Sequence, residues 1–79
     1  MDQEKVRVGA IFEESGKIRP IWFGLRRRKH EIRKITYHWT HQRGKTLYHH
    51  FAVTDDGGTY ELVYNTDDGI WLIADMAGR

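Results

Sequence analysis

The chain contains no cysteine, so it has no disulfide, and no thiolate can serve as a nucleophile or a metal ligand. This composition fits a reducing compartment, where disulfides are rare. No apolar run approaches the roughly 18 residues of a membrane-spanning helix. The polar start also lacks the apolar segment of a signal peptide. Together these absences predict a soluble, cytoplasmic protein with no membrane partner.

Helix signals are also scarce, because apolar residues nowhere recur with a sustained spacing of three and four. Apolar and polar residues alternate instead, and turn-forming residues recur about every ten positions. The short length indicates one domain over residues 1–79. We therefore predict an all-β fold, a small antiparallel meander of five or six strands that curls into a barrel or roll.

The first two strands are expected over residues 5–13 and 17–26, joined by a two-residue turn at Ser15-Gly16. In this register Trp22 turns away from the core beside Gly9, because successive side chains alternate between faces. The single proline, Pro20, has no amide donor and should lie at an edge or at a position whose N–H would face outward. The expected cross-strand pairs are Ala10 with Ile21, Val8 with Phe23 and Val6 with Leu25.

The third strand is expected over residues 29–40, and two features of it conflict with a simple hairpin. The turn before it, residues 26–29, has no glycine, asparagine or aspartate, so a two-residue turn is strained there. The apolar phase also changes between Ile32 and Ile35. A bulge near Arg33-Lys34 would restore it.

The later strands follow from two glycine-containing turns. Asp56-Gly57 predicts a type I′ turn, and Asp67-Asp68-Gly69 predicts a three-residue turn with a left-handed glycine. A fourth strand is expected over residues 47–54. The expected pairs are His41 with Leu47, Trp39 with His49, Tyr37 with Phe51, Ile35 with Val53, Val53 with Tyr60, Phe51 with Leu62, His49 with Tyr64, Tyr64 with Leu72 and Leu62 with Ala74.

These registers divide the apolar residues between two faces. The inner face would hold the core, and the outer face would carry an apolar set that needs a cover, which could be the chain's own curl, a protein partner or a second copy. The outer set is Trp22, Val63, Trp71 and Ile73. The expected inner face is Val6, Val8, Phe12, Ile21, Phe23, Leu25, Ile35, Tyr37, Trp39, Phe51, Val53, Tyr60, Leu62, Tyr64 and Leu72.

Charge is distributed unevenly along the chain. Residues 1–50 carry a balance of +7, and residues 51–79 a balance of −5. One interpretation is that the two halves attract each other in the fold. The other is that the basic stretch binds the phosphates of DNA or RNA, with a neighbouring aromatic ring stacked on a base. The candidate nucleic-acid residues are Arg26, Arg27, Arg28, Lys29, Arg33, Lys34 and Trp22.

Sites for catalysis or metal binding are weak in the sequence. The expected register sets His38 opposite His50 on the outer face, but no carboxylate or thiolate joins them as a ligand. The pairs Asp55-Asp56 and Asp67-Asp68 precede glycines, where aspartate is favoured for backbone reasons. We therefore predict a non-enzymatic protein without catalytic residues, a metal site or a cofactor.

Residues 20–72 contain an aromatic residue, a short basic turn and alternating apolar residues up to Trp39, then Tyr60-Glu61-Leu62 and Gly69-Ile70-Trp71. In this pattern the chain resembles a family of small uncharacterised bacterial β-barrel-like domains. Arg27 stands where such domains tend to have glycine. The resemblance implies a barrel-like fold and no assigned activity. Its loose association with bacterial DNA-damage-tolerance polymerases slightly favours nucleic-acid binding.

The sequence thus predicts a binding module, with nucleic acid at the basic turn as the first hypothesis. Protein binding or self-association through the outer apolar set is the alternative. A metal- or small-ligand-binding barrel ranks third.

Overall fold

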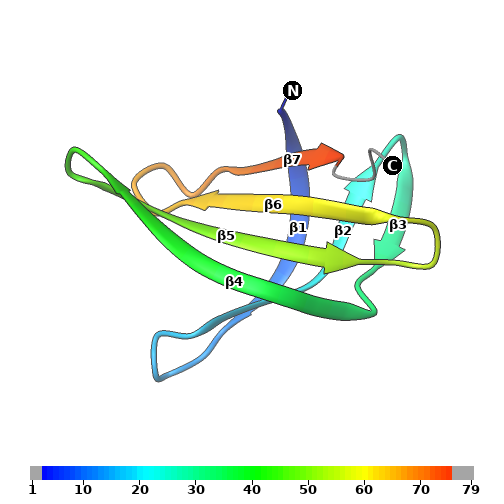
Figure 1. Cartoon of the computed structure of the whole chain (residues 1–79), viewed down its shortest axis with the longest axis horizontal. Coiled ribbons are helices and arrows are strands. Elements are labelled where there is room, and N and C mark those ends of the chain that lie inside the picture. The colour runs from blue at the N-terminus through cyan, green and yellow to red at the C-terminus, as the bar shows by residue number, and fades with distance from the viewer. Residues whose placement is uncertain (1–2, 76–79) are drawn as a thin grey trace.

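The computed structural model describes residues 3–75, which form seven antiparallel strands and no helix (Figure 1). Their order in the sheet is β3-β2-β1-β7-β6-β5-β4. This confirms the all-β meander. There are more than six strands because the expected third strand is divided at residues 32–33. The strands are β1 (Glu4–Phe12), β2 (Ile18–Leu25), β3 (Arg28–Glu31), β4 (Lys34–Arg43), β5 (Thr46–Thr54), β6 (Thr59–Asn65) and β7 (Trp71–Asp75).

Strand β1 belongs to both halves of the sheet. Its residues 4–6 pair with β7, and its residues 7–12 pair with β2. In Figure 1, β1, β2 and β3 run across the direction of β4 to β7, so the sheet curls into a half-barrel. The core lies on the inner face of the curl. Its buried residues are Ile18, Phe23, Phe51, Val53, Leu62, Trp71 and Ile73.

The β1–β2 hairpin contains two departures from the expected register that offset each other. The amide of Glu13 donates to the carbonyl of Lys17 at 2.8 Å, so the loop has three residues and ends in a left-handed glycine, Gly16 (φ 95°). An irregularity at Ile21 then shifts the register back by one residue. Ala10 therefore pairs with Pro20 rather than with Ile21, whereas Val8 pairs with Phe23 as expected.

Pro20 is fully buried beside this bulge. This position agrees with the expectation, because no second strand pairs with Pro20 among the described residues. Pro20 pairs with β1 on one side, but β3 pairs only with residues 22–25 of β2 and ends before it reaches Pro20. A bulge at the end of a neighbouring strand is a position where the missing amide donor disrupts no ladder.

The β4–β5 hairpin departs further from the expected register. The register shift lies at Thr36, not at Arg33-Lys34. The hydroxyl of Thr36 donates a hydrogen bond to the carbonyl of Ala52 at 3.1 Å. Ile35 pairs with Val53 as expected, but every later pair is displaced by one residue. A one-residue displacement moves side chains to the other face of a sheet. Tyr37 (72% exposed) and Trp39 (40% exposed) therefore lie outside the core.

Two further residues of the expected core are exposed. Ile21 is the extra residue of the β2 bulge, and Phe12 lies at the end of β1, where its ring contacts Tyr64 edge-on. The bulge explains Ile21 because an unpaired residue does not keep the alternation of its neighbours.

The last two hairpins give one confirmation and one correction. Every expected β5–β6 pair is present, including Phe51 with Leu62. The β6–β7 loop is one residue longer than expected, because the amide of Asn65 donates to the carbonyl of Ile70 at 3.0 Å. Tyr64 consequently pairs with Trp71, and Leu62 pairs with Ile73. Gly69 is left-handed as predicted (φ 73°).

Candidate nucleic-acid interface

The β2–β3 turn presents two arginines at its tip. Leu25 pairs with Arg28, so Arg26 and Arg27 are the two turn residues, and both are exposed. Their φ angles are 53° and 65°, the left-handed values of a type I′ turn. Non-glycine residues adopt this conformation at a cost of about 1–2 kcal/mol each. The structure thus adopts the turn that the sequence marks as strained.

Trp22 lies on the outer face of the β1–β2–β3 segment, as predicted. It pairs with Gly9, and its indole covers that glycine so closely that an added Cβ would lie 2.0 Å from Nε1. The guanidinium carbon of Arg7 lies 5.9 Å from the indole centroid, and the ammonium of Lys29 lies 5.2 Å from it. Glycine at position 9 therefore lets a half-buried aromatic ring lie flat between two cations.

A hollow of about 540 Å³ adjoins this tryptophan, and it is lined by Lys5, Arg7 and Trp71 as well as by Trp22 itself. The sequence analysis did not include Lys5 and Arg7 in the site. The alternation of β1 contained the necessary signal, because Val6 and Val8 face inward and the residues between them must face the other way. Glu31, which pairs with Trp22, is the acidic residue on this face.

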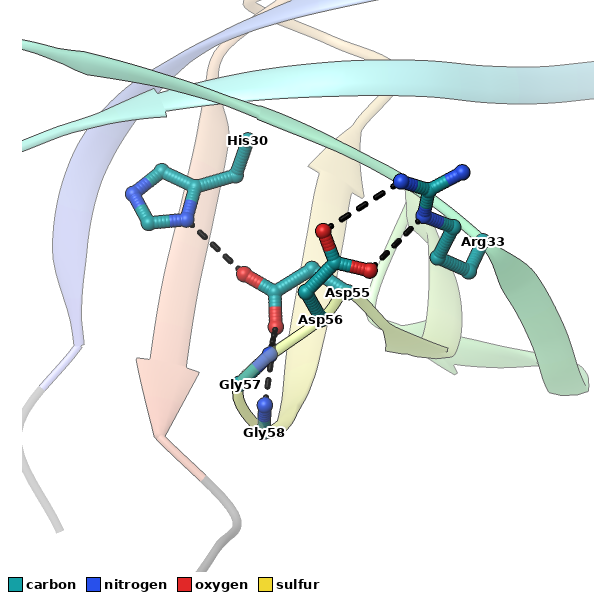
Figure 2. A network of polar contacts seen from close by, with 6 residues as sticks. All are labelled: His30, Arg33, Asp55, Asp56, Gly57 and Gly58. Carbon is teal, nitrogen blue, oxygen red and sulfur yellow. Dashed lines mark hydrogen bonds and ion pairs between the residues drawn. The ribbon is translucent and has the colours of Figure 1, made fainter.

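The base of the basic hairpin is fixed by a histidine–aspartate pair (Figure 2). Nδ1 of His30 lies 2.8 Å from Oδ2 of Asp55, and these side chains are only 23% and 8% exposed. The other oxygen of Asp55 accepts hydrogen bonds from the amides of Gly57 and Gly58 at 2.7 and 2.8 Å. The ring of His30 stacks on the buried Phe23, with centroids 4.9 Å apart.

The surroundings of Asp55 shift the pKa of its carboxyl in two opposing directions. Burial raises the pKa of its carboxyl, but the hydrogen bonds from His30, Gly57 and Gly58 lower it more. The net effect is a pKa below the ordinary aspartate value of 3.8. Asp55 is therefore a structural carboxylate, which agrees with the turn role that the sequence assigned to it. The type I′ expectation for Asp56-Gly57 is wrong, because neither residue is left-handed.

Arg33 forms a bidentate contact with Asp56, with distances of 2.9 and 3.2 Å. Figure 2 shows the two aspartates of this turn pointing apart, Asp55 toward His30 and Asp56 toward Arg33. The basic and acidic halves of the chain do attract each other at this point. Arg33 is therefore engaged by the fold, whereas no ion pair forms at the four consecutive cations of the hairpin among residues 3–75. These four are Arg26, Arg27, Arg28 and Lys29.

The remaining candidates do not join this surface. Lys34 lies at the start of β4, near Arg19 and Pro20. Trp71 and Ile73 are buried in the core, and Val63 is 4% exposed, so no outer apolar set forms around Trp22. The displaced β6–β7 register explains this correction, because it turns Trp71 and Ile73 inward.

The histidines are also arranged differently from the expectation. His38 pairs with Phe51 on the inner face, and its Nε2 lies 3.2 Å from Nδ1 of His49. His50 stands on the outer face, where Nδ1 lies 2.6 Å from Glu61 and the ring stacks on Trp39. Among the described residues no three histidine or acidic side chains form a set that could hold a metal.

Across the described part of the chain, no helix is long and apolar enough to cross a membrane. The fold and this surface define a class, a small antiparallel half-barrel with a basic, tryptophan-containing outer face. No protein-family model, curated protein or solved structure gives a significant match to the chain.

Proposed function

We propose that this protein is a non-enzymatic module that binds single-stranded DNA or RNA through the outer face of its first three strands. The observation that carries the proposal is Trp22, whose ring centroid lies 5.9 Å from Arg7 and 5.2 Å from Lys29, on a hairpin whose turn arginines form no ion pair within the described residues. We call the set Lys5, Arg7, Trp22, Arg26, Arg27 and Lys29 the basic face, and Arg28, which pairs with Leu25, adjoins it at the turn.

The chemistry of the basic face matches a single strand better than a duplex. Lysine and arginine contact phosphates and release counterions, which supplies most of the sequence-independent affinity. An indole ring stacks on an unpaired base, which a duplex keeps inside its own stack, and such stacking contributes about 1–3 kcal/mol per base. The glycine under the ring keeps the indole flat on the sheet.

The strain at the β2–β3 turn gives independent support. Asparagine and glycine adopt left-handed angles at lower cost, yet the chain has arginine at both positions. Neither arginine forms an ion pair within the described residues that would compensate for this cost. A negatively charged partner would form ion pairs with both arginine side chains.

The direct test is fluorescence polarisation of labelled dT and rU oligonucleotides as a function of salt. We expect the triple variant Arg26→Glu/Arg27→Glu/Arg28→Glu to lose binding while its unfolding transition is unchanged. Lys17→Glu/Arg43→Glu/Lys45→Glu is the matched control, because it makes the same change of charge away from the basic face. It should retain most of the affinity.

A third variant separates stacking from charge. Trp22→Leu keeps an apolar side chain over Gly9 and every cation, and it should weaken binding by about 1–3 kcal/mol with the same salt dependence. Equal loss of binding in the two triple variants would show that only net charge matters. Unchanged binding in Arg26→Glu/Arg27→Glu/Arg28→Glu would refute the basic face as the site.

A further inference from the structure

Among residues 3–75, the half-barrel leaves its longest strand without a partner on one side. Strand β4 has ten residues, is last in the sheet order and pairs only with β5. Across the opening, residues 18–20 of β2 pair with β1 alone, because β3 pairs only with residues 22–25. Two backbone edges with free donors and acceptors therefore flank the gap. A long free edge of this kind pairs readily with another strand.

The gap between these edges is hollow and has an apolar floor. A space of about 380 Å³ is lined by Ile18, Ile35 and Phe51, of which Ile18 and Phe51 are buried. A second hollow of about 220 Å³ continues past Pro20 and Ile32 toward the corner between β3 and β4. We call these two hollows with the free edge of β4 the open groove. An added strand would cover the floor with alternate side chains.

The charged side chains that line the open groove are all basic among the described residues. They are Lys17, Arg19, Arg33 and Lys34. Glu13 and Asp56 pair with Arg19 and Arg33, which leaves Lys17 and Lys34 available. Strand β4 itself has a cation at each end, Lys34 and Arg43, and contains no acid.

The same charges argue against a second copy of this chain. Two β4 strands paired antiparallel about their centre would place Lys34 opposite Arg43 twice, and like charges directly opposite are destabilising. A nucleic acid lacks the alternating amide donors and carbonyl acceptors that extend a β-ladder. Of the two exposed aromatics of β4, Tyr37 borders the first hollow and Trp39 lines neither hollow.

We propose that the open groove binds an extended acidic peptide, which pairs with β4 and extends the half-barrel. Its apolar side chains face Ile35 and Phe51, and the alternating acidic side chains lie on the outer side near Lys34 and Arg43. The backbone ladder supplies affinity, and the end cations supply the preference for acidic sequences. This site is separate from the basic face and does not depend on it.

The probe is an acetylated and amidated peptide of alternating valine and glutamate, titrated into the isotope-labelled protein. We expect amide shifts along β4 and at Ile18 and Arg19, and slowed hydrogen exchange for the β4 amides that point away from β5. The matching valine–lysine peptide should bind at least about tenfold more weakly. Shifts of β4 caused by a dT oligonucleotide instead of the peptide would overturn the proposal.

Two variants and two modified peptides complete the test. Lys34→Glu/Arg43→Glu should weaken the valine–glutamate peptide about tenfold. Arg26→Glu/Arg27→Glu, the matched control, should not. N-methylation of all valine amides removes the donors of one peptide edge, and N-methylation of all glutamate amides removes those of the other. One of these two peptides should lose binding. If both bind as well as the parent peptide, no ladder forms and the proposal is wrong.

Discussion

The β2–β3 turn and the β5–β6 turn are opposite in charge and differ in what the fold does with that charge. In the acidic turn, Asp55 and Asp56 both bond to residues that precede them by more than twenty positions. In the basic turn, Arg26 and Arg27 form no ion pair within the described residues. Charged residues are thus structural in one turn, and in the other they remain available for a partner.

The backbones of the two turns differ in the same sense. Asp55 stabilises its own turn by accepting two amide hydrogen bonds, and no residue there is left-handed. The basic turn has two left-handed arginines instead. Stability explains the residues of the acidic turn, but it does not explain those of the basic turn.

The largest loss of stability is expected in the core, and the effects in the two turns can be compared with it. Phe51 is 1% exposed and contacts Trp71, so we expect Phe51→Ala to lower the free energy of unfolding by about 3–5 kcal/mol. Chemical denaturation measures this change. A loss under about 1 kcal/mol would contradict the β5 register.

In the acidic turn, Asp55→Ala should be the most damaging change. It leaves His30 and two glycine amides without their acceptor, which costs about 1–3 kcal/mol. Asp55→Asn is the matched variant, because it keeps one oxygen acceptor and should lose less. Equal stability of Asp55→Ala and the parent protein would show that this turn is no better anchored than the basic one.

The lowered pKa of Asp55 predicts an acid-sensitive contribution to stability. The folded pKa lies below the ordinary value of 3.8, so the contribution is complete above that value and is lost as the pH falls through the folded pKa. Urea unfolding between about pH 2.5 and 6 should show a steeper acid loss in the parent protein than in Asp55→Asn. Parallel pH profiles would contradict this assignment.

In the basic turn, substitution should raise stability rather than lower it. Arg26→Asn/Arg27→Gly suits the left-handed angles, so we expect the free energy of unfolding to rise by about 1 kcal/mol. The same variant should bind oligonucleotides more weakly, because two cations are removed. A variant that loses stability would show that the arginines serve the fold.

The smallest expected effect is at the exposed ion pair. Arg33 and Asp56 are 62% and 82% exposed, so Asp56→Ala should change stability by less than about 1 kcal/mol. High salt should reduce the difference further. A cost as large as that of Asp55→Ala would mean that exposure does not distinguish the two aspartates.

The sequence predicted the fold class and the β5–β6 register, because that hairpin contains no irregularity. It could not locate the bulges at Ile21 and Thr36, because no particular residue type marks the extra residue of a bulge. The alternation of apolar and polar residues also resumes on either side of it. The consequence was large at Thr36, where a shift of one residue moved Tyr37 and Trp39 out of the core.

The candidate site was predictable only where the strand register was correct. Trp22 lies beyond the bulge at Ile21, where the extra loop residue and the bulge residue offset each other, so its pairing with Gly9 matches the expected register. The engagement of Arg33 by Asp56 depends on the strand break at residues 32–33, which alternation does not reveal. Of the basic stretch, the sequence located the β2–β3 hairpin but not its turn, which is Arg26-Arg27 rather than residues 26–29.

The pairing of β1 with β7 has a kinetic consequence. Every other strand pair joins neighbours in the sequence, but here residues 4–6 meet residues 71–73. Such distant contacts must overcome the entropy of closing nearly the whole chain into a loop. We expect the hairpins to form first and this pairing to limit the folding rate. A destabilising substitution at Val6 should therefore slow folding rather than only speed unfolding.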